Sequence, residues 1–222
     1  RRAVLLLDDA ADAEQVDALL PDNPDCLAVT VSSGPLTGIA DVRPCTLGGL
    51  DTKSSVELLS RLTGSVRVTV DPRAAERLAE QCQGQPAALV LAGGWLAARP
   101  KAAVADLAKQ LHTETGNGSV VDRAARLVHD ALPSTAARML RLLSLAPAGL
   151  TDPHTAAALA GCSVEAARTT LDDFAAQGLL HSVGTAVPQY RVPCCLHPSL
   201  HDLARTHERP GELQLARARM LE

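Results

Sequence analysis

The sequence has almost no aromatic residues, since Trp95, Phe174 and Tyr190 are single members of their types. Single-stranded nucleic acids bind largely by stacking on aromatic side chains, so this scarcity argues against such an activity. The chain also lacks a cluster of basic residues. Its 21 Lys and Arg are interspersed among 25 Asp and Glu, giving a net charge of −4. Direct contact with nucleic acid is therefore disfavoured.

Long apolar runs are absent as well. A membrane-spanning helix needs about eighteen or more consecutive apolar residues, and the stretch Ala3–Leu7 is too short even for a signal-peptide core. The six cysteines are scattered without a disulfide framework. We therefore expect a cytoplasmic protein without a membrane segment, whose thiols are reduced and mostly buried. The chain begins with Arg, which favours a fragment or a processed product.

The first fifty residues have the pattern of an α/β layer. The apolar run of residues 3–8 predicts a strand buried on both faces, and residues 26–31 predict a second. Between them, Ala13–Leu20 is amphipathic and predicts a helix with Asp12 at its N-cap. Residues 43–47 are consistent with a third short strand. Alternating strands and helices predict part of a parallel sheet.

The pattern then becomes helical. An Asp-Pro pair at residues 71–72 is a strong helix start, and glycines follow several helices. We expect helices over residues 53–63, 71–83, 86–98 and 101–112, with a linker at 116–119.

The last part predicts a winged helix. Helices are expected over residues 134–145, 153–160 and 163–177, the third with a buried stripe of Val164, Ala167, Leu171 and Phe174. Residues 179–182 and 190–196 are expected to pair across residues 184–188 as a two-stranded wing. The fold class is thus α/β, a partial parallel sheet, followed by a mostly α-helical domain and a winged helix. The predicted boundaries are 1–50, 51–118 and 119–208, with 209–222 beginning a further helical segment.

The sharpest chemical motif is Leu5–Ala10, LLLDDA. In phosphate-loop NTPases an apolar strand presents one acid to magnesium at its carboxyl end, and a second acid orients the attacking water. Asp8 would take the metal role and Asp9 the catalytic role. The alternative is an ordinary strand followed by a solvated acidic turn, and the motif alone does not choose between them.

The order of segments adds to this motif. LLLDDA, LAVTVSS, CQGQPAALVLAGGWLA, VHDALPSTAARMLRLLSL and LLHSVG…YRV…LHPSLHDLARTH together resemble the NB-ARC family of STAND nucleotide switches along almost the whole chain. The similarity is greatest to bacterial NB-ARC regulators. It implies ADP or ATP with Mg²⁺ as cofactor, and a winged helix that relays the nucleotide state.

The resemblance also implies roles for individual residues. Gly84-Gln85-Pro86-Ala87 is similar to the family's glycine-x-proline-leucine motif, whose proline packs near adenine. His197 and His201 are both similar to the histidine of the family's histidine-aspartate motif, which contacts the β-phosphate of ADP. His201 keeps the following aspartate, whereas His197 fits the distance from the wing better, so both registers stay open.

Two departures from the family pattern bear on function. The chain contains no glycine-rich loop with Lys-Ser/Thr, and no arginine follows the second strand at Thr30-Val31-Ser32-Ser33. The family's central strand would also be missing, from a place between strands that are present here. Apolar edges should then be exposed, and the chain would need its own upstream phosphate-loop segment, a protein partner or rearranged pairing.

Other classes of site are weaker. Cys194, Cys195, His197 and His201 have ligand types for zinc, but prolines interrupt the segment and adjacent cysteines chelate one metal poorly. The third helix of the winged helix would enter a DNA groove, yet it carries Glu165, Asp172 and Asp173 against Arg168.

The sequence therefore predicts a regulatory nucleotide-switch module of a bacterial signalling or transcription-regulatory protein. It would be an ATPase only with a phosphate loop supplied from upstream. An effector domain and other protein partners are expected, with oligomerisation left open. The alternatives are a degenerate, non-catalytic interaction scaffold and a DNA-binding winged-helix regulator.

Overall fold

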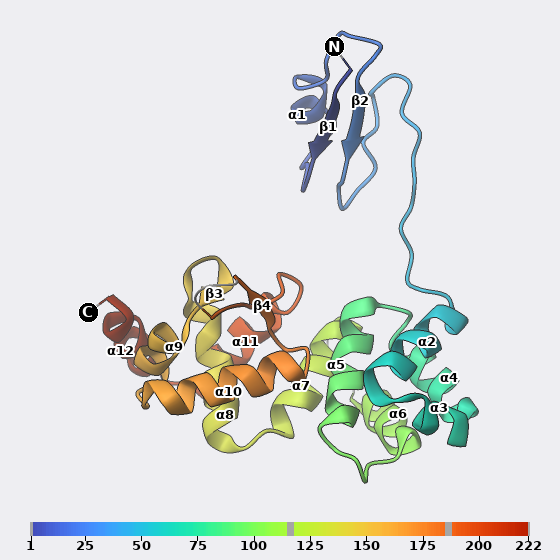
Figure 1. Ribbon diagram of the computed structural model, residues 1–222. Coiled ribbons are helices and arrows are strands. Elements are labelled where there is room, and N and C mark those ends of the chain that lie inside the picture. The colour runs from blue at the N-terminus through green and yellow to red at the C-terminus, as the bar shows by residue number, and fades with distance from the viewer. Residues whose placement is uncertain (1, 115–117, 185–187, 222) are drawn as a thin grey trace. The chain divides into compact units, whose positions relative to one another are not determined.

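The computed structural model describes residues 2–114, 118–184 and 188–221. The chain divides into two compact units, Arg1–Leu47 and Gly48–Glu222. We call them the strand unit and the helical unit and describe each by itself (Figure 1). The predicted fold class is confirmed: a short parallel sheet near the N-terminus precedes a mostly helical region, which carries a small antiparallel sheet near the C-terminus.

The strand unit is built on two parallel strands, β1 (Val4–Leu7) and β2 (Leu27–Thr30). They pair directly in the register Val4↔Leu27 to Leu7↔Thr30. Helix α1 (Ala13–Asp17) connects them, with the Asp12 carboxylate accepting a hydrogen bond from the Gln15 amide. Val16 is the buried residue of this helix. The expected intervening strand is therefore not needed for these two strands to pair.

The strands are not buried on both faces, so this prediction is wrong within the strand unit. Val4 and Leu6 of β1 are 73% and 66% exposed, and Leu27 of β2 is 59% exposed. Alternating residues of each strand are less exposed, because side chains of a strand point to opposite faces in turn. We predicted exposed apolar edges; the exposed apolar side chains lie instead on one face of the strand pair. We call it the open strand face, formed by Val4, Leu6, Leu27 and Val29.

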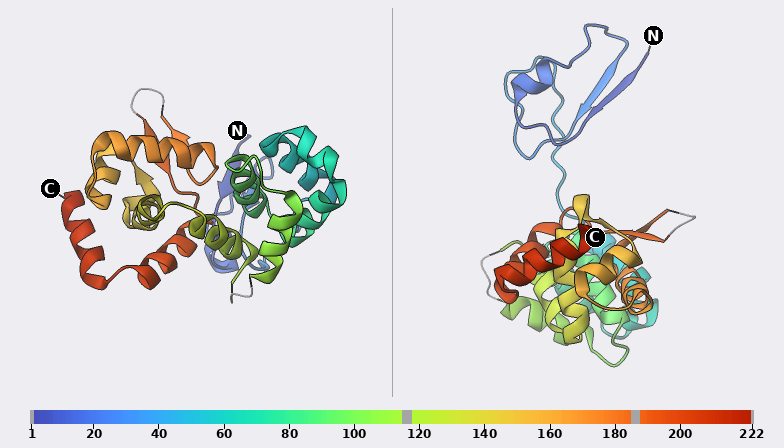
Figure 2. Two further views of the ribbon diagram at one scale, coloured as in Figure 1. Left: turned by 90° about the horizontal axis from the view of Figure 1, so that it is seen from below. Right: turned by 90° about the vertical axis from the view of Figure 1, so that its left-hand side faces the viewer.

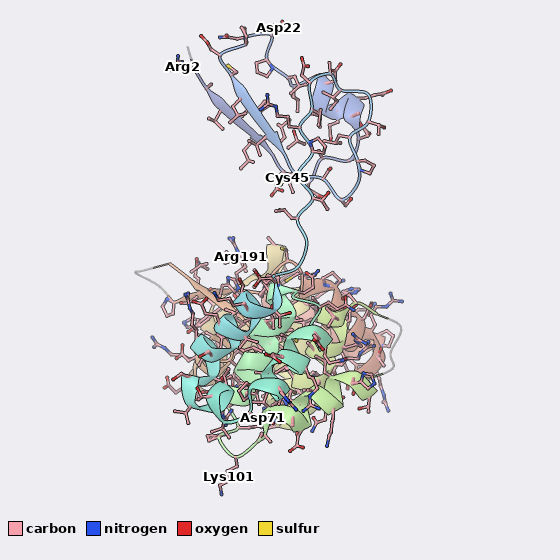
Figure 3. The ribbon with its side chains drawn as sticks, turned by 90° about the vertical axis from the view of Figure 1, so that its right-hand side faces the viewer. Arg2, Asp22, Cys45, Asp71, Lys101 and Arg191 are labelled. Atoms are coloured by element: carbon pink, nitrogen blue, oxygen red, sulfur yellow. The ribbon has the colours of Figure 1, made fainter. Side chains whose placement is uncertain are left out.

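Two further predictions for this unit are corrected. Residues 43–47 form no strand, because the segment after β2 runs extended without a partner; Cys45 lies in it (Figure 3). The predicted helix Ala13–Leu20 ends at Asp17, since Ala18–Leu20 close it with turn-type hydrogen bonds before Pro21.

The helical unit begins with a lobe of five helices. They are α2 (Thr52–Thr63), α3 (Ser65–Val70), α4 (Pro72–Gln81), α5 (Pro86–Ala97) and α6 (Val104–Thr113). Asp51 and Asp71 cap α2 and α4 by accepting hydrogen bonds from backbone amides three residues on. Almost every residue of α5 from Ala88 to Leu96 is buried, so α5 is the centre of this lobe. The predicted linker 116–119 lies partly outside the described residues.

The second lobe carries the winged helix. It contains α8 (Ser134–Leu142), η1 (Leu143–Leu145), η2 (Pro147–Gly149), β3 (Leu150–Thr151), α9 (Pro153–Ala160), α10 (Val164–Ala176), β4 (His181–Val183), β5 (Gln189–Arg191), α11 (His197–His207) and α12 (Pro210–Leu221). Helix α7 (Val120–Asp130) lies between the two lobes, which occupy opposite sides of the unit (Figure 2). The sheet has the antiparallel order β3-β5-β4.

The predicted buried stripe of α10 is largely confirmed. Ala167, Leu171 and Phe174 are buried, whereas Val164 is 39% exposed because it begins the helix. The wing is confirmed as β4 paired with β5, and the centre of its predicted turn lies outside the described residues. None of the helices in the described part of the chain has the length and apolar character of a membrane span.

Two glycines in α5 allow close packing, Gly93 within the first lobe and Gly94 between the two lobes. Glycine inside a helix is less favourable than alanine by about 1 kcal/mol, so a Gly-Gly pair there needs a packing reason. A Cβ on Gly93 would lie 2.6 Å from Leu62 Cδ1 of α2. A Cβ on Gly94 would lie 1.8 Å from the carbonyl oxygen of Gln177, at the end of α10. Gly94 is thus a point of direct backbone contact between the lobes.

Candidate functional site

Asp8 and Asp9 follow β1 at its carboxyl end. Because β1 and β2 are parallel, the ends of both strands lie side by side, with Leu7 opposite Thr30. Both carboxylates are exposed. The Asp9 amide donates to Asp8 Oδ1 at 3.0 Å, and Asp9 has a left-handed φ of 55°. After this turn the Ala10 amide donates to the Val31 carbonyl at 2.9 Å, so the two acids lie in a turn held against the end of β2, at the kind of sheet edge where α/β proteins bind their ligands.

Asp8 and Asp9 could supply only some of the ligands that a magnesium ion needs. Mg²⁺ prefers oxygen ligands and is often held by one or two carboxylates together with substrate phosphates. Asp8 and Asp9 supply carboxylates at a sheet edge, whereas the phosphate contacts would have to come from other groups. No cluster of three or more metal-ligating side chains occurs among residues 2–114, 118–184 and 188–221. This leaves zinc at Cys194, Cys195, His197 and His201 without structural support.

Pro86 is the first residue of α5, and it is exposed. Gly84, two residues earlier, has a φ of +63°, and its carbonyl accepts a hydrogen bond of 2.7 Å from the Leu50 amide. A Cβ on Gly84 would lie 2.2 Å from the Leu50 carbonyl oxygen. Glycine is therefore required by both conformation and space. The turn before Pro86 joins the start of the helical unit to the α4–α5 connection.

His197 and His201 lie one turn apart on α11, and both are partly exposed. His197 begins the helix, facing Gly149: a Cβ there would be 3.8 Å from its Cδ2. Since the two histidines share a helix and similar exposure, the choice between them stays open.

The start of α11 is tied to α7 through Asp122. The Ser199 hydroxyl donates to the Asp122 carboxylate, which also accepts from the Ser119 amide at 2.7 Å. Burial acts to raise the pKa of Asp122, but hydrogen bonds from Ser199 and Ser119 and the charge of Arg126 hold it below its usual value. The Asp122 carboxylate is therefore a charged anchor that fixes the segment carrying His197.

The predicted site residues are thus distributed over the two units. Asp8 and Asp9 belong to the strand unit, whereas Pro86, His197 and His201 belong to different lobes of the helical unit. The structure does not test the roles assigned to them, which stay predictions.

The cysteines differ from expectation. Cys45, Cys162, Cys194 and Cys195 are exposed, so the prediction of mostly buried thiols is wrong. The buried Cys82 behaves as expected of a core thiol: burial raises its pKa to about 12 despite the opposing charge of Arg123. Several exposed cysteines lie in turns beside helix ends, where sequence hydrophobicity does not predict burial.

The surface of α10 is acidic, as the sequence predicts. Glu165, Asp172 and Asp173 are exposed beside Arg168. The Tyr190 hydroxyl donates to Asp172 Oδ1 at 2.5 Å, and burial together with this carboxylate raises the pKa of Tyr190 to about 12. Asp172 therefore stabilises the wing strand from the helix, and its charge adds to a face that would repel phosphates.

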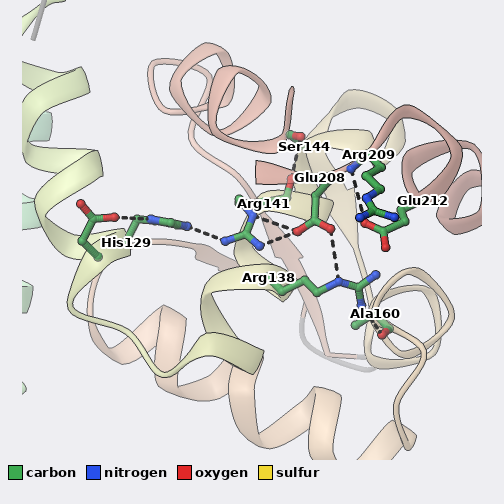
Figure 4. Close-up of polar contacts among 9 residues, drawn as sticks. His129, Arg138, Arg141, Ser144, Ala160, Glu208, Arg209 and Glu212 are labelled. Atoms are coloured by element: carbon green, nitrogen blue, oxygen red, sulfur yellow. Dashed lines mark hydrogen bonds and ion pairs between the residues drawn. The ribbon is translucent and has the colours of Figure 1, made fainter. Parts of the chain in front are cut away.

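A buried polar cluster in the second lobe was missed by sequence reasoning (Figure 4). We call His129, Arg138, Arg141 and Glu208 the Glu208 cluster. The Glu208 side chain is 4% exposed, and its Oε1 accepts from Arg141 Nε at 3.0 Å and from Arg141 Nη2. Its Oε2 accepts from Arg138 Nε at 3.4 Å.

The Glu208 cluster connects several helices. Arg138 Nη1 donates to the Ala160 carbonyl at the end of α9 at 3.1 Å, and Arg141 Nη1 donates to His129 Nε2 of α7 at 2.8 Å. Burial acts to raise the pKa of Glu208, but Arg141 and Arg138 hold it below its usual value. The spacing of Arg138 and Arg141 on one side of an apolar helix was the available sequence signal.

The chain thus combines a small parallel α/β unit, which carries two acids at its strand ends, with a helical unit that contains a winged helix. No family model matches the chain. The chain is 29% identical over 238 residues to the regulatory protein AfsR of Streptomyces griseus, covering 100% of the chain and 23% of that protein. It is 28% identical over 216 residues to the regulatory protein AfsR of Streptomyces coelicolor, covering 94% of the chain and 21% of that protein.

These similarities extend over the whole chain, which is a distant homologue of bacterial regulatory proteins. The chain spans less than a quarter of the length of these relatives.

Proposed function

We propose that this chain is part of a nucleotide-dependent switch in a bacterial regulatory protein. The observation that carries the proposal is the pair of exposed acids, Asp8 and Asp9, at the carboxyl edge of two parallel strands. The helical and winged-helix body that follows supports it, because a switch needs a second element whose position depends on the ligand. The distant similarity to regulatory proteins supports the regulatory role.

In this proposal each predicted residue has a defined task. Asp8 binds Mg²⁺ and Asp9 orients the attacking water, while Pro86 packs near adenine. One histidine of α11, His197 or His201, contacts the β-phosphate of ADP. A segment preceding residue 1 supplies the phosphate-binding loop, and ADP favours one arrangement of the two units while ATP favours another.

The open strand face argues that a further polypeptide segment covers this side of the sheet. Parallel sheets are normally covered on both faces, so Val4, Leu6 and Leu27 at 59–73% exposure argue for further cover. In the proposal this cover comes from the phosphate-loop segment of the same polypeptide.

The test is calorimetric titration of ADP and of ATP with Mg²⁺ into a longer polypeptide that includes the preceding segment. We expect binding that Asp8→Ala weakens for ATP–Mg²⁺, because a metal ligand is lost. His197→Ala or His201→Ala should weaken ADP, and whichever does so chooses the register. His154→Ala is the matched control, since His154 is exposed on α9.

The second candidate is a protein-interaction scaffold that binds no nucleotide. It is favoured by the absence of arginine in Thr30-Val31-Ser32-Ser33, at the end of β2, where a sensor of the γ-phosphate would lie. Absence of heat from either nucleotide with the longer polypeptide would rule out the switch and leave the scaffold.

A further inference from the structure

His129 has a partner at each ring nitrogen. Nδ1 lies 2.8 Å from Asp130 Oδ1, and Nε2 lies 2.8 Å from Arg141 Nη1 (Figure 4). A guanidinium only donates hydrogen bonds, so Nε2 must accept. The proton of the neutral ring is therefore on Nδ1, from which it is donated to Asp130. The side chain is 5% exposed, so water does not compete for either nitrogen.

The charges around the ring are balanced when it is neutral. Two guanidiniums, Arg138 and Arg141, face two carboxylates, Glu208 and Asp130. The other titratable group against the ring is His207 of α11, whose ring centroid is 5.2 Å away. A proton on Nε2 would oppose the N–H groups of Arg141 and add an unbalanced charge at a buried position.

The contacts join segments that are far apart in sequence. His129 lies near the end of α7, Arg141 is on α8, and Glu208 is the first of the two residues between α11 and α12. Since Arg141 bridges the other two, the position of its guanidinium determines whether α7 and the α11–α12 junction are held together.

We propose that His129 is a proton-sensitive latch on the Glu208 cluster. The neutral imidazole holds Arg141 in place for Glu208. Protonation releases Arg141 from Nε2, so the end of α7 separates from the α11–α12 junction. The latch does not depend on nucleotide, and it would make the position of α12 sensitive to acidification.

The direction of the pH dependence follows from the surroundings of the ring. Burial lowers the pKa of His129 below its ordinary value of 6.5; Asp130 opposes this, and the charges of Arg141 and His207 add to it. The stabilisation is therefore complete above pH 6.5 and is lost as the pH falls toward the pKa of the folded state. Glu208 stays ionised in this window, because its pKa lies below 4.5.

The test compares thermal midpoints at pH 7.5 and 5.5 for the wild-type chain, His129→Gln and His154→Gln. Glutamine keeps an acceptor for Arg141 and a donor for Asp130 but does not titrate in this range. We expect the wild-type midpoint to be lower at pH 5.5 than at pH 7.5 by about 2–4 °C, the size of change that the loss of a single stabilising interaction gives in a protein of this length. The fall should largely disappear in His129→Gln and persist in His154→Gln, where the exposed ring has no such contact. An equal fall in His129→Gln would overturn the proposal.

Nitrogen NMR of the wild-type imidazole keeps the proposal testable if His129→Gln does not fold. The expected spectrum at pH 7.5 shows the Nδ1–H tautomer, with a titration midpoint below 6.5. An Nε2–H tautomer, or a midpoint at 6.5 or above, would contradict the latch.

Discussion

Glu208→Ala should destabilise the helical unit more than any other single change of a charged residue proposed here. The variant leaves Arg141 and Arg138 near a buried position without the carboxylate that accepts from both. Removing one partner of a buried ion pair costs about 3–5 kcal/mol, because the remaining charge is uncompensated. The loss corresponds to a fall in the thermal midpoint of about 10 °C, measurable by circular dichroism.

Glu57→Ala is the matched control for this prediction. Glu57 pairs with Arg61 on the surface of α2, where the two side chains are 59% and 74% exposed. Such pairs on a helix contribute about 0.3–0.5 kcal/mol, so the midpoint should move by a degree or two. Equal effects of the two substitutions would show that burial of Glu208 does not determine its contribution.

Gly94→Ala is expected to force the two lobes of the helical unit apart. The added methyl would lie 1.8 Å from the backbone oxygen of Gln177, and a backbone group cannot move aside as a flexible side chain can. Overpacking of this kind costs about 1–3 kcal/mol or more, and the better helix propensity of alanine offsets about 1 kcal/mol. Because the clash is with backbone, we expect the cost near the upper end of this range and a net loss of up to about 2 kcal/mol in urea unfolding.

The neighbouring Trp95 makes this change directly observable. It is the single tryptophan of the chain and is 7% exposed, so its emission should shift to longer wavelength if the lobes separate. Gly211→Ala is the control, because a Cβ at Gly211 in α12 meets nothing within 4 Å. That variant should keep the wild-type emission and gain up to about 1 kcal/mol. A Gly94→Ala variant with unchanged emission and stability would contradict the close contact.

The helix boundaries were predictable where a local residue determines them. Asp152 accepts from the Thr155 amide to begin α9, and Gly161 ends it with a φ of +68°. These signals act over a few residues and are visible in the sequence. The helix α3 was not predicted, because its β-branched residues Val66, Val68, Thr69 and Val70 favour strand by propensity. In the structure Arg67 of α3 donates to the Leu96 and Arg99 carbonyls, contacts that the local sequence does not reveal.

Features that depend on pairing between distant parts of the chain could not be predicted from the sequence. Strand β3 has two residues, too few for any alternation to be recognised, and it exists because Thr151 pairs with Tyr190. The Glu208 cluster has the same origin, since Arg141 and Glu208 are 67 residues apart in sequence. Sequence patterns reveal which residues are apolar, but not which buried charges meet.

Of the candidate site, the placement of Asp8 and Asp9 at a strand end was predictable from the apolar run before them. Their participation in nucleotide binding stays a prediction, because the phosphate-binding loop is not part of this sequence. The same holds for Pro86, His197 and His201. The structure gives their positions but does not test their roles in binding.

The central claim is that nucleotide changes the arrangement of the two units. Its most direct test is energy transfer between dyes at Asp22→Cys and Glu165→Cys, both exposed positions, in the longer polypeptide with its exposed cysteines replaced by serine. We predict one transfer efficiency with ADP–Mg²⁺ and a distinct one with ATP–Mg²⁺, the difference being lost in Asp8→Ala. Identical efficiencies without nucleotide, with ADP and with ATP would contradict the switch.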